Sequence, residues 1–209
     1  MVNGLSISPD QNTSAEASAS EIRLHKFLRG SHIFSASVGE ILGTKFLQEV
    51  SPDPLTVLQF HLLKLIKLNG RRQVGEVAEC LGVTSPAATK NIDKLERLGL
   101  ITRTPSKGDR RATLLSVSTR GRKLVDAYEE LKTARMAPVL DRFNPEEIEQ
   151  FSDLLERFSV SMLDLEQPGR GFCLRCAMYI ESNCPIGQVL GGCPYDKPHG
   201  ERRNEGVDQ

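Results

Sequence analysis

The chain has 209 residues, of which 39% are hydrophobic, 26% charged and 5% aromatic. This length allows one compact domain with extensions but not two large domains, and the composition predicts a mainly helical protein with an aliphatic core. No apolar stretch approaches the ~20 residues that cross a bilayer. The N-terminus also lacks the basic and apolar segments of a secretory signal. We therefore expect a cytoplasmic protein that has no membrane partner.

The formal net charge of +0 hides a strong asymmetry along the chain. Residues 71–123 contain 12 Lys and Arg against 5 Asp and Glu, a net charge of +7. Residues 124–166 contain 4 against 11, a net charge of −7. Such a division indicates that one part of the chain meets a polyanion and the other does not.

The N-terminal part is predicted to be a leader followed by two helices. Residues 1–20 are rich in Ser, Ala, Asn and Gln, which is typical of a disordered segment. Apolar residues then recur at helical spacing from about Glu21 to about Glu49. Ser51-Pro52-Asp53-Pro54 ends this long helix, which we assign, as residues 21–52, to dimerisation. A second helix carries Leu55, Leu58, Leu62 and Leu65 and ends near Gly70.

Two shorter helices come next, separated by a tight turn. The first carries Val74, Val77, Ala78 and Leu81 and ends at Gly82. The second opens at Thr84-Ser85-Pro86, where Ser85 can cap the helix and Pro86 suits the first helical position. It runs to Leu98 and stops at Gly99.

A polar hairpin follows these helices. Two short strands are predicted over Leu100–Thr104 and Ala112–Ser118. The loop between them, residues 105–111, contains one lysine and two arginines. We assign residues 53–123, which end just after the hairpin, to a DNA-binding domain.

Two further helices and a cysteine-rich tail complete the chain. A long helix starts near Thr119, and Pro138 is predicted to kink or break it. Asn144-Pro145-Glu146-Glu147 has the capping chemistry of a helix start. The last helix has a coiled-coil-like seam of Ile148, Phe151, Leu155, Phe158, Met162 and Leu165. We assign residues 124–166 to dimerisation and residues 167–209 to a metal-binding tail.

A helix, a tight turn, a second helix and a basic hairpin follow one another in the order of a winged helix-turn-helix. The predicted fold class is therefore mainly α, with helices plus a two-stranded β wing. We expect this protein to bind double-stranded DNA and not to be an enzyme.

The predicted DNA-binding residues lie on the second helix and in the wing. On the helix, the inner face carries Ala88, Ile92 and Leu95, and the other positions can reach base edges or phosphates. In the wing, an arginine can enter the minor groove, and Asp109 is expected to orient an arginine and close the turn. The predicted contact residues are Ser85, Ala87, Lys90, Asn91, Lys94, Arg97, Lys107, Arg110 and Arg111.

The segment Leu55–Val125 resembles the MarR family of bacterial transcription regulators. The resemblance rests on LGVTSPAATKNIDKLERLGLITR at residues 81–103 and KGDRRATLLSVSTRGRKLV at residues 107–125. It covers about residues 21–166 and implies a helical homodimer with one wing per subunit, in which both ends of the core contribute to a helical dimerisation region. It also implies binding to a pseudo-palindromic operator, usually as a repressor. Many members also bind small-molecule effectors, although no effector pocket can be placed from this sequence. The chain departs from the family after Glu166, where most members stop.

The tail carries Cys173, Cys176, Cys184 and Cys193 in a segment rich in Gly and Pro. Such a segment buries little core and needs a cross-link to fold, and clustered cytosolic cysteines are typically metal ligands. Four thiolates can hold an iron–sulfur cluster, with a [4Fe–4S] cluster expected, or Zn²⁺. The prolines after Cys184 and Cys193 and the apolar surroundings favour iron–sulfur, and zinc is the alternative.

The position of these cysteines, just after the last dimerisation helix, suggests that a cluster senses a signal and alters DNA binding. With zinc, the tail is structural and the signal enters through an effector pocket. A metal-stabilised interaction adaptor and a redox metalloenzyme are the rivals of another class. The fifth cysteine, Cys80, is expected to be a small buried hydrophobe rather than a sensor.

Overall fold

The structure is a computed structural model that describes residues 10–70, 72–106, 113–163, 165 and 184. The chain divides into two compact units, residues 1–45 and 46–209. Across the described ranges, no helix combines the length and the apolar character needed to cross a membrane.

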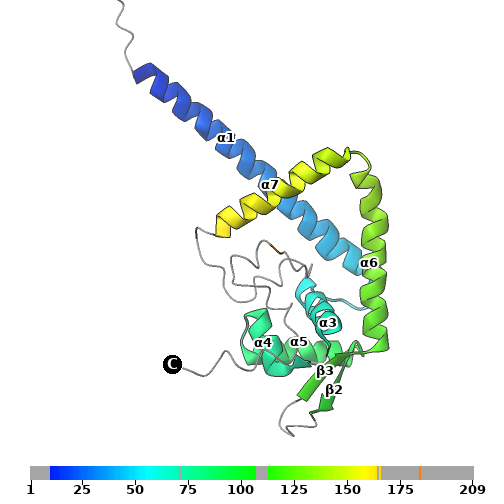
Figure 1. Cartoon of the computed structure of the whole chain (residues 1–209). Coiled ribbons are helices and arrows are strands. Elements are labelled where there is room, and N and C mark those ends of the chain that lie inside the picture. The colour runs from blue at the N-terminus through cyan, green and yellow to red at the C-terminus, as the bar shows by residue number, and fades with distance from the viewer. Residues whose placement is uncertain (1–9, 71, 107–112, 164, 166–183, 185–209) are drawn as a thin grey trace, which may run out of the picture. The chain divides into compact units, whose positions relative to one another are not determined.

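The first unit is a long helical segment. It consists of α1 (Asp10–Ser37) and the π-helix η1 (Val38–Lys45) (Figure 1). The prediction of a disordered leader over residues 1–20 is therefore wrong from Asp10 onward. That segment has few large apolar residues, but it contains Ala15, Ala17 and Ala19, and alanine has the highest helix propensity.

The second unit begins with α2 (Phe46–Val50), which ends just before Pro52 as predicted. The next helix is α3 (Val57–Asn69). At its start, Thr56 and Gln59 form a reciprocal capping box that satisfies two free backbone N–H groups. At its end, Gly70 has φ 70°, a value that favours glycine.

The helix-turn-helix consists of α4 (Val74–Leu81) and α5 (Ser85–Arg97). Gly82 has φ 59° in the turn between them, as expected of a glycine that ends a helix. The predicted start of α5 is wrong by one residue, because Thr84 is the N-cap and Ser85 is already helical. Thr84 has the extended backbone of a cap, although its side chain makes no capping hydrogen bond.

The sheet has three antiparallel strands in the order β1-β3-β2. The wing strands β2 (Ile101–Pro105) and β3 (Thr113–Val117) match the prediction, and Figure 1 shows them extending away from the helices. The sequence analysis missed β1 (Arg72–Gln73), which pairs with Leu114 and Leu115 of β3. A strand of two residues is too short to show the alternation of apolar and polar residues by which a strand is recognised in a sequence.

The two C-terminal helices are α6 (Thr119–Leu140) and α7 (Pro145–Leu163). Pro138 does not break α6, which continues to Leu140, and the amide of Asp141 still donates to Ala137 at 2.9 Å. The predicted helix start at Asn144 is confirmed. Its side chain accepts from the amide of Glu147 at 2.8 Å, and the Glu147 carboxylate accepts from the Asn144 amide at 3.0 Å.

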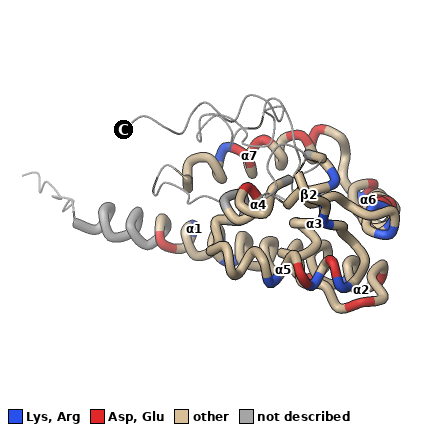
Figure 2. The backbone as a smooth tube through the Cα atoms, turned by 90° about the horizontal axis from the view of Figure 1, so that it is seen from below, with Lys and Arg blue, Asp and Glu red and all other residues tan. Residues whose placement is uncertain are grey.

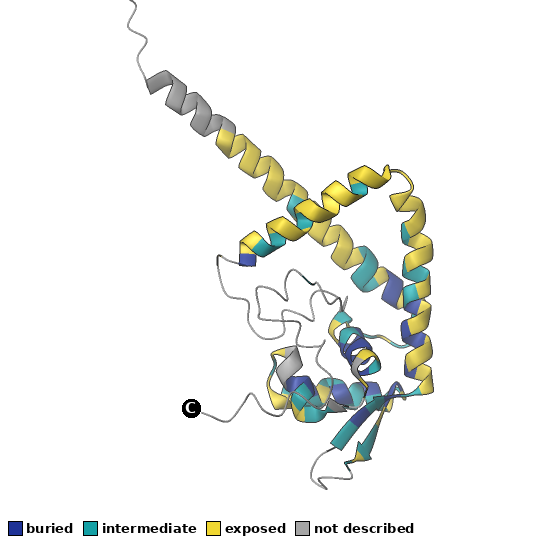
Figure 3. Ribbon diagram, in the orientation of Figure 1, coloured by how far each residue is buried: buried dark blue, intermediate teal, exposed yellow. Residues whose placement is uncertain are grey.

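The core of the second unit lies between α3, α4, α5, the sheet and the first half of α6 (Figure 3). Its largest fully buried side chains are Leu47, Leu62, Leu63, Leu65, Ile66, Val77, Ile92, Leu95, Ile101, Leu115 and Val125. By contrast, α7 buries only Leu163 among its described residues, and Phe151 and Phe158 are exposed at 49% and 42%. The predicted seam residue Leu165 lies beyond the end of α7.

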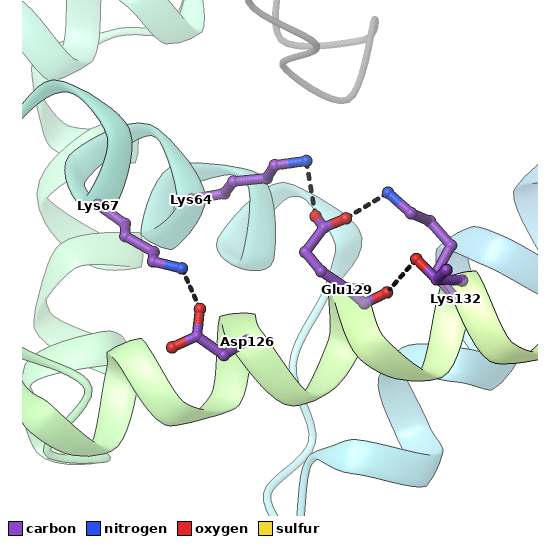
Figure 4. Close-up of polar contacts among 6 residues, drawn as sticks. Lys64, Lys67, Asp126, Glu129 and Lys132 are labelled. Atoms are coloured by element: carbon purple, nitrogen blue, oxygen red, sulfur yellow. Dashed lines mark hydrogen bonds and ion pairs between the residues drawn. The ribbon is translucent and has the colours of Figure 1, made fainter.

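Ion pairs join α3 to α6 beside this core (Figure 4). The Lys64 ammonium lies 2.8 Å from the Glu129 carboxylate, which also accepts from Lys132, and Lys67 pairs with Asp126. Burial raises the pKa of Glu129, but the hydrogen bonds and charges of Lys132 and Lys64 outweigh it, so the pKa lies below its ordinary value. The two neighbouring lysines therefore favour the ionised form of Glu129.

Candidate nucleic-acid interface

The inner face of α5 is packed into the core as predicted. Ala88, Ile92 and Leu95 are all 0% exposed and follow one another at helical spacing. Packing of this stripe fixes how the helix is rotated about its axis. The rotation in turn decides which side chains α5 presents to solvent.

An open hollow of about 590 Å³ lies over the outer face of α5. Among the described residues, its lining consists of Ser85, Pro86, Thr89, Lys90, Asp93 and Arg97. Ser85, Lys90 and Arg97 were predicted to contact DNA, and they share this face. The sequence analysis did not select Pro86, Thr89 and Asp93. Thr89 and Asp93 lie four and eight residues after Ser85, so helical spacing could have identified them, and Pro86 lies three residues before Thr89.

Asn91 and Lys94, which were predicted to contact DNA, make hydrogen bonds to residues in and just before α3 in this structure. The Asn91 Oδ1 accepts from Gln59 Nε2 of α3 at 3.1 Å, and its Nδ2 donates to the Ala87 carbonyl at 3.0 Å. Lys94 donates to the Pro54 carbonyl, just before α3, at 2.6 Å. In this structure both side chains hold α5 against the α3 region rather than extending from its outer face.

The wing strand β2 is tied to α5 by one arginine. Arg103 pairs with Asp93, and its Nε lies 3.3 Å from Glu96. Basic and acidic residues alternate along α5 (Figure 2). The single positive charge of Arg103 offsets part of the negative charge of Asp93 and Glu96, and Lys90 and Arg97 add positive charge to the outer face. Arg103 therefore links the position of the wing to that of the helix.

The start of α6 is joined closely to the end of α5. Ser118 caps α6 by accepting from the Gly121 amide at 3.0 Å, and its hydroxyl donates to the Gly99 carbonyl at 2.7 Å. Arg120 donates to the Leu98 carbonyl at 2.7 Å and pairs with Asp53 at 2.6 Å. Ser118 and Arg120, at the start of α6, thus bind the residues that follow α5 and Asp53 in the loop before α3.

Several predicted site residues lie outside the described residues. These are the wing residues Lys107, Asp109, Arg110 and Arg111 and the tail residues Cys173, Cys176 and Cys193. Cys184 is described and is partly exposed, whereas the side chain of Cys80 is not described. Within the described part, no three metal-ligating side chains come together, so the tail prediction stays a prediction.

Comparison with known proteins agrees with this geometry. Residues 53–112 match the model of the MarR family. The YusO protein from Bacillus subtilis is 27% identical, with a TM-score of 0.54, over 73% of this chain and 97% of that one.

Two other solved structures share the fold at lower identity. A MarR family transcription regulator is 16% identical, with a TM-score of 0.59, over 71% of this chain and 95% of that one. FabT from Streptococcus pneumoniae, solved in complex with DNA, is 21% identical, with a TM-score of 0.51, over 71% and 99%. The fold is the winged helix-turn-helix of MarR regulators, and residues 53–112 carry the signature of the MarR family.

Proposed function

We propose that the chain is a sequence-specific DNA-binding transcription regulator. The observation that carries this proposal is the outer face of α5, where Ser85, Lys90 and Arg97 lie together on a helix whose other side is anchored in the core. A helix held in this way, beside a two-stranded wing, suits insertion into the major groove. The structures of FabT with DNA and of a MarR mutant from E. coli with operator DNA support the assignment.

The charges around α5 favour a polyanion. Asp93 and Glu96 are engaged by Arg103, and Lys90 and Arg97 line the hollow. A cationic face attracts the phosphates of duplex DNA and releases their counterions, which supplies much of the affinity. An enzyme or a protein-interaction adaptor has no need of this arrangement.

The test is DNA binding by the full-length chain, followed by fluorescence anisotropy. A duplex selected from a random pool is titrated with wild type, with a Lys90→Ala/Arg97→Ala variant and with Arg142→Ala. We expect the double variant to lose at least about thirtyfold in affinity, since a contact to a base contributes about 1–3 kcal/mol and two such contacts contribute about 2–6 kcal/mol. Arg142 follows the far end of α6, so Arg142→Ala should bind like wild type. Equal binding by all three proteins would contradict the proposal.

We also propose that the protein acts as a homodimer on a pseudo-palindromic operator. The support is an exposed apolar line on α7, where Phe151, Phe158 and Met162 are exposed at 49%, 42% and 52%. Large apolar side chains gathered on one helix face typically mark an interface. Repression is the mode of action that the family resemblance implies.

For the tail, we propose that Cys173, Cys176, Cys184 and Cys193 bind an iron–sulfur cluster, with zinc as the alternative. The support is the spacing of four cysteines in a short segment rich in Gly and Pro, since thiolates are ligands for both metals. The test is a visible spectrum with iron, sulfide and zinc analysis on protein purified without oxygen. Broad absorbance near roughly 400 nm with bound iron and sulfide supports the cluster. A colourless protein with one zinc per chain overturns it and leaves the signal to an effector pocket.

The tail follows α7, so we propose that its state alters DNA binding. Loss of the four-thiolate cross-link would release the segment that follows α7 and change how the two subunits hold their recognition helices. The two helices must be separated by about one DNA turn, roughly 34–36 Å. Operator affinity of wild type should therefore change with oxidant, whereas that of Cys173→Ser should not. Identical oxidant responses in both proteins would contradict the coupling.

A further inference from the structure

We propose that Thr89, together with Pro86, contacts the 5-methyl group of a thymine in the bound DNA and so determines part of the sequence specificity. This inference rests on the proposed DNA-binding function and assigns a base-reading role that the sequence analysis gave to other residues. Both residues line the hollow on the outer face of α5.

The hydrogen bonding of Thr89 uses its only donor and leaves its methyl group available for an apolar contact. The Thr89 hydroxyl donates to the Ser85 carbonyl one turn earlier, at 2.8 Å. This bond satisfies the hydroxyl proton within the helix, as is common for threonines in helices. A side chain in this state offers a neighbouring base a methyl group more readily than a hydrogen-bond donor.

Pro86 extends the same apolar spot. It lies three residues before Thr89, so the two side chains are neighbours on the helix surface, and Pro86 is exposed. A proline ring has no N–H and offers only apolar surface at this place. Together the two residues form a small apolar area near the N-terminal end of α5, which is the end that reaches base edges in helix-turn-helix proteins.

The charges beside this area identify its occupant. Lys90 and Arg97 line the same hollow, and the Asp93 carboxylate is engaged by Arg103. An apolar spot bordered by cations matches the major-groove edge of thymine, where the 5-methyl group lies between two phosphate backbones. An apolar protein partner would not require the cations, and a free anion would not require the apolar spot.

The experiment scans a selected duplex by replacing each thymine with deoxyuridine, which removes only the methyl group. Affinities are measured for the full-length wild type, Thr89→Ser, Thr89→Val and Thr133→Ser. Thr89→Ser keeps the hydroxyl and loses the methyl group, and Thr89→Val does the reverse. Thr133→Ser is the matched control, because Thr133 on α6 makes the same kind of bond, to the Glu129 carbonyl at 3.0 Å.

We expect at least one thymine position where wild type, Thr89→Val and Thr133→Ser bind the deoxyuridine duplex about three- to fourfold more weakly, the factor expected for one buried methyl group. At that position Thr89→Ser should bind both duplexes equally. If no position responds, or if Thr89→Ser responds like wild type, the inference is overturned. Failure of wild type to bind any duplex overturns the proposed function itself, which is a distinguishable result.

Discussion

Gln59 Nε2 of α3 donates to Asn91 Oδ1 of α5 at 3.1 Å, while Gln59 Oε1 accepts from the Thr56 amide at the start of α3. A single buried side chain, 7% exposed, thus completes the cap of α3 and holds α5 in place. The contact explains why Asn91 does not extend from the outer face of α5. The orientation of that face therefore depends on a residue of another helix.

Replacing this residue should affect both stability and DNA binding. Gln59→Leu removes both hydrogen bonds and leaves Asn91 Oδ1 without this partner, so we expect a loss of about 1–3 kcal/mol in the free energy of unfolding. DNA affinity should also fall, because α5 loses an anchor. Urea denaturation followed by circular dichroism measures the first effect and anisotropy the second. Gln48→Leu is the control, since Gln48 is exposed on α2. Equal stabilities of the two variants would show that the Gln59 contacts contribute little.

Gly121 lies so close to the Leu100 carbonyl that the position should not accept any residue with a side chain. A Cβ at Gly121 would lie 2.1 Å from that backbone oxygen, so Gly121→Ala must displace α6 from the base of the wing. We expect a loss of about 1–3 kcal/mol, measured as a lower melting temperature. Gly75→Ala is the matched control: a Cβ there meets nothing within 4 Å, and alanine should stabilise α4 by about 0.5–1 kcal/mol. A Gly121→Ala protein as stable as Gly75→Ala would contradict this packing.

The α3–α6 ion pairs should make stability depend on acid pH. The pKa of Glu129 lies below its ordinary value of 4.5 in the folded protein, so ionised Glu129 stabilises the fold above that pH. This contribution is lost as the pH falls through the lowered pKa. Urea midpoints from pH 7 to pH 3 should show wild type more stable than Glu129→Gln at neutral pH, with the difference shrinking below about pH 4.5. Asp126→Asn serves as a comparison at a more exposed pair. A difference that does not change with pH would mean that Glu129 acts through packing and not through its charge.

The sequence predicted the elements of the second unit well because their local signals are strong. The glycines at 82 and 99, the Asn144–Glu147 capping box and the buried stripe of α5 each point to one structure, and all are present. The features that the sequence did not reveal depend on long-range contacts. Nothing near Asn91 in the sequence reveals that Gln59 is its partner, and β1 is defined only by its pairing with β3.

The apolar line on α7 should prove to be a subunit interface. Phe158→Glu places a charge on the exposed line, and we expect it to shift the protein from dimer to monomer, because an unpaired buried charge is strongly disfavoured at an interface. Light scattering coupled to gel filtration measures the mass. Gln150→Glu adds the same charge off this line and should leave the dimer intact. A monomeric wild type, or an unchanged mass for Phe158→Glu, would rule out this interface.

The most direct test of the central claim is the salt dependence of DNA binding by the full-length wild-type protein. If the outer face of α5 and the wing meet the phosphate backbone of duplex DNA, the logarithm of the affinity should fall linearly with the logarithm of the salt concentration. With about six phosphate contacts, we expect a loss of roughly a thousandfold between about 50 and 200 mM salt. The Lys90→Ala/Arg97→Ala variant should show a shallower slope. No binding at low salt, or an affinity that does not change with salt, would contradict the account of this chain as a DNA-binding regulator.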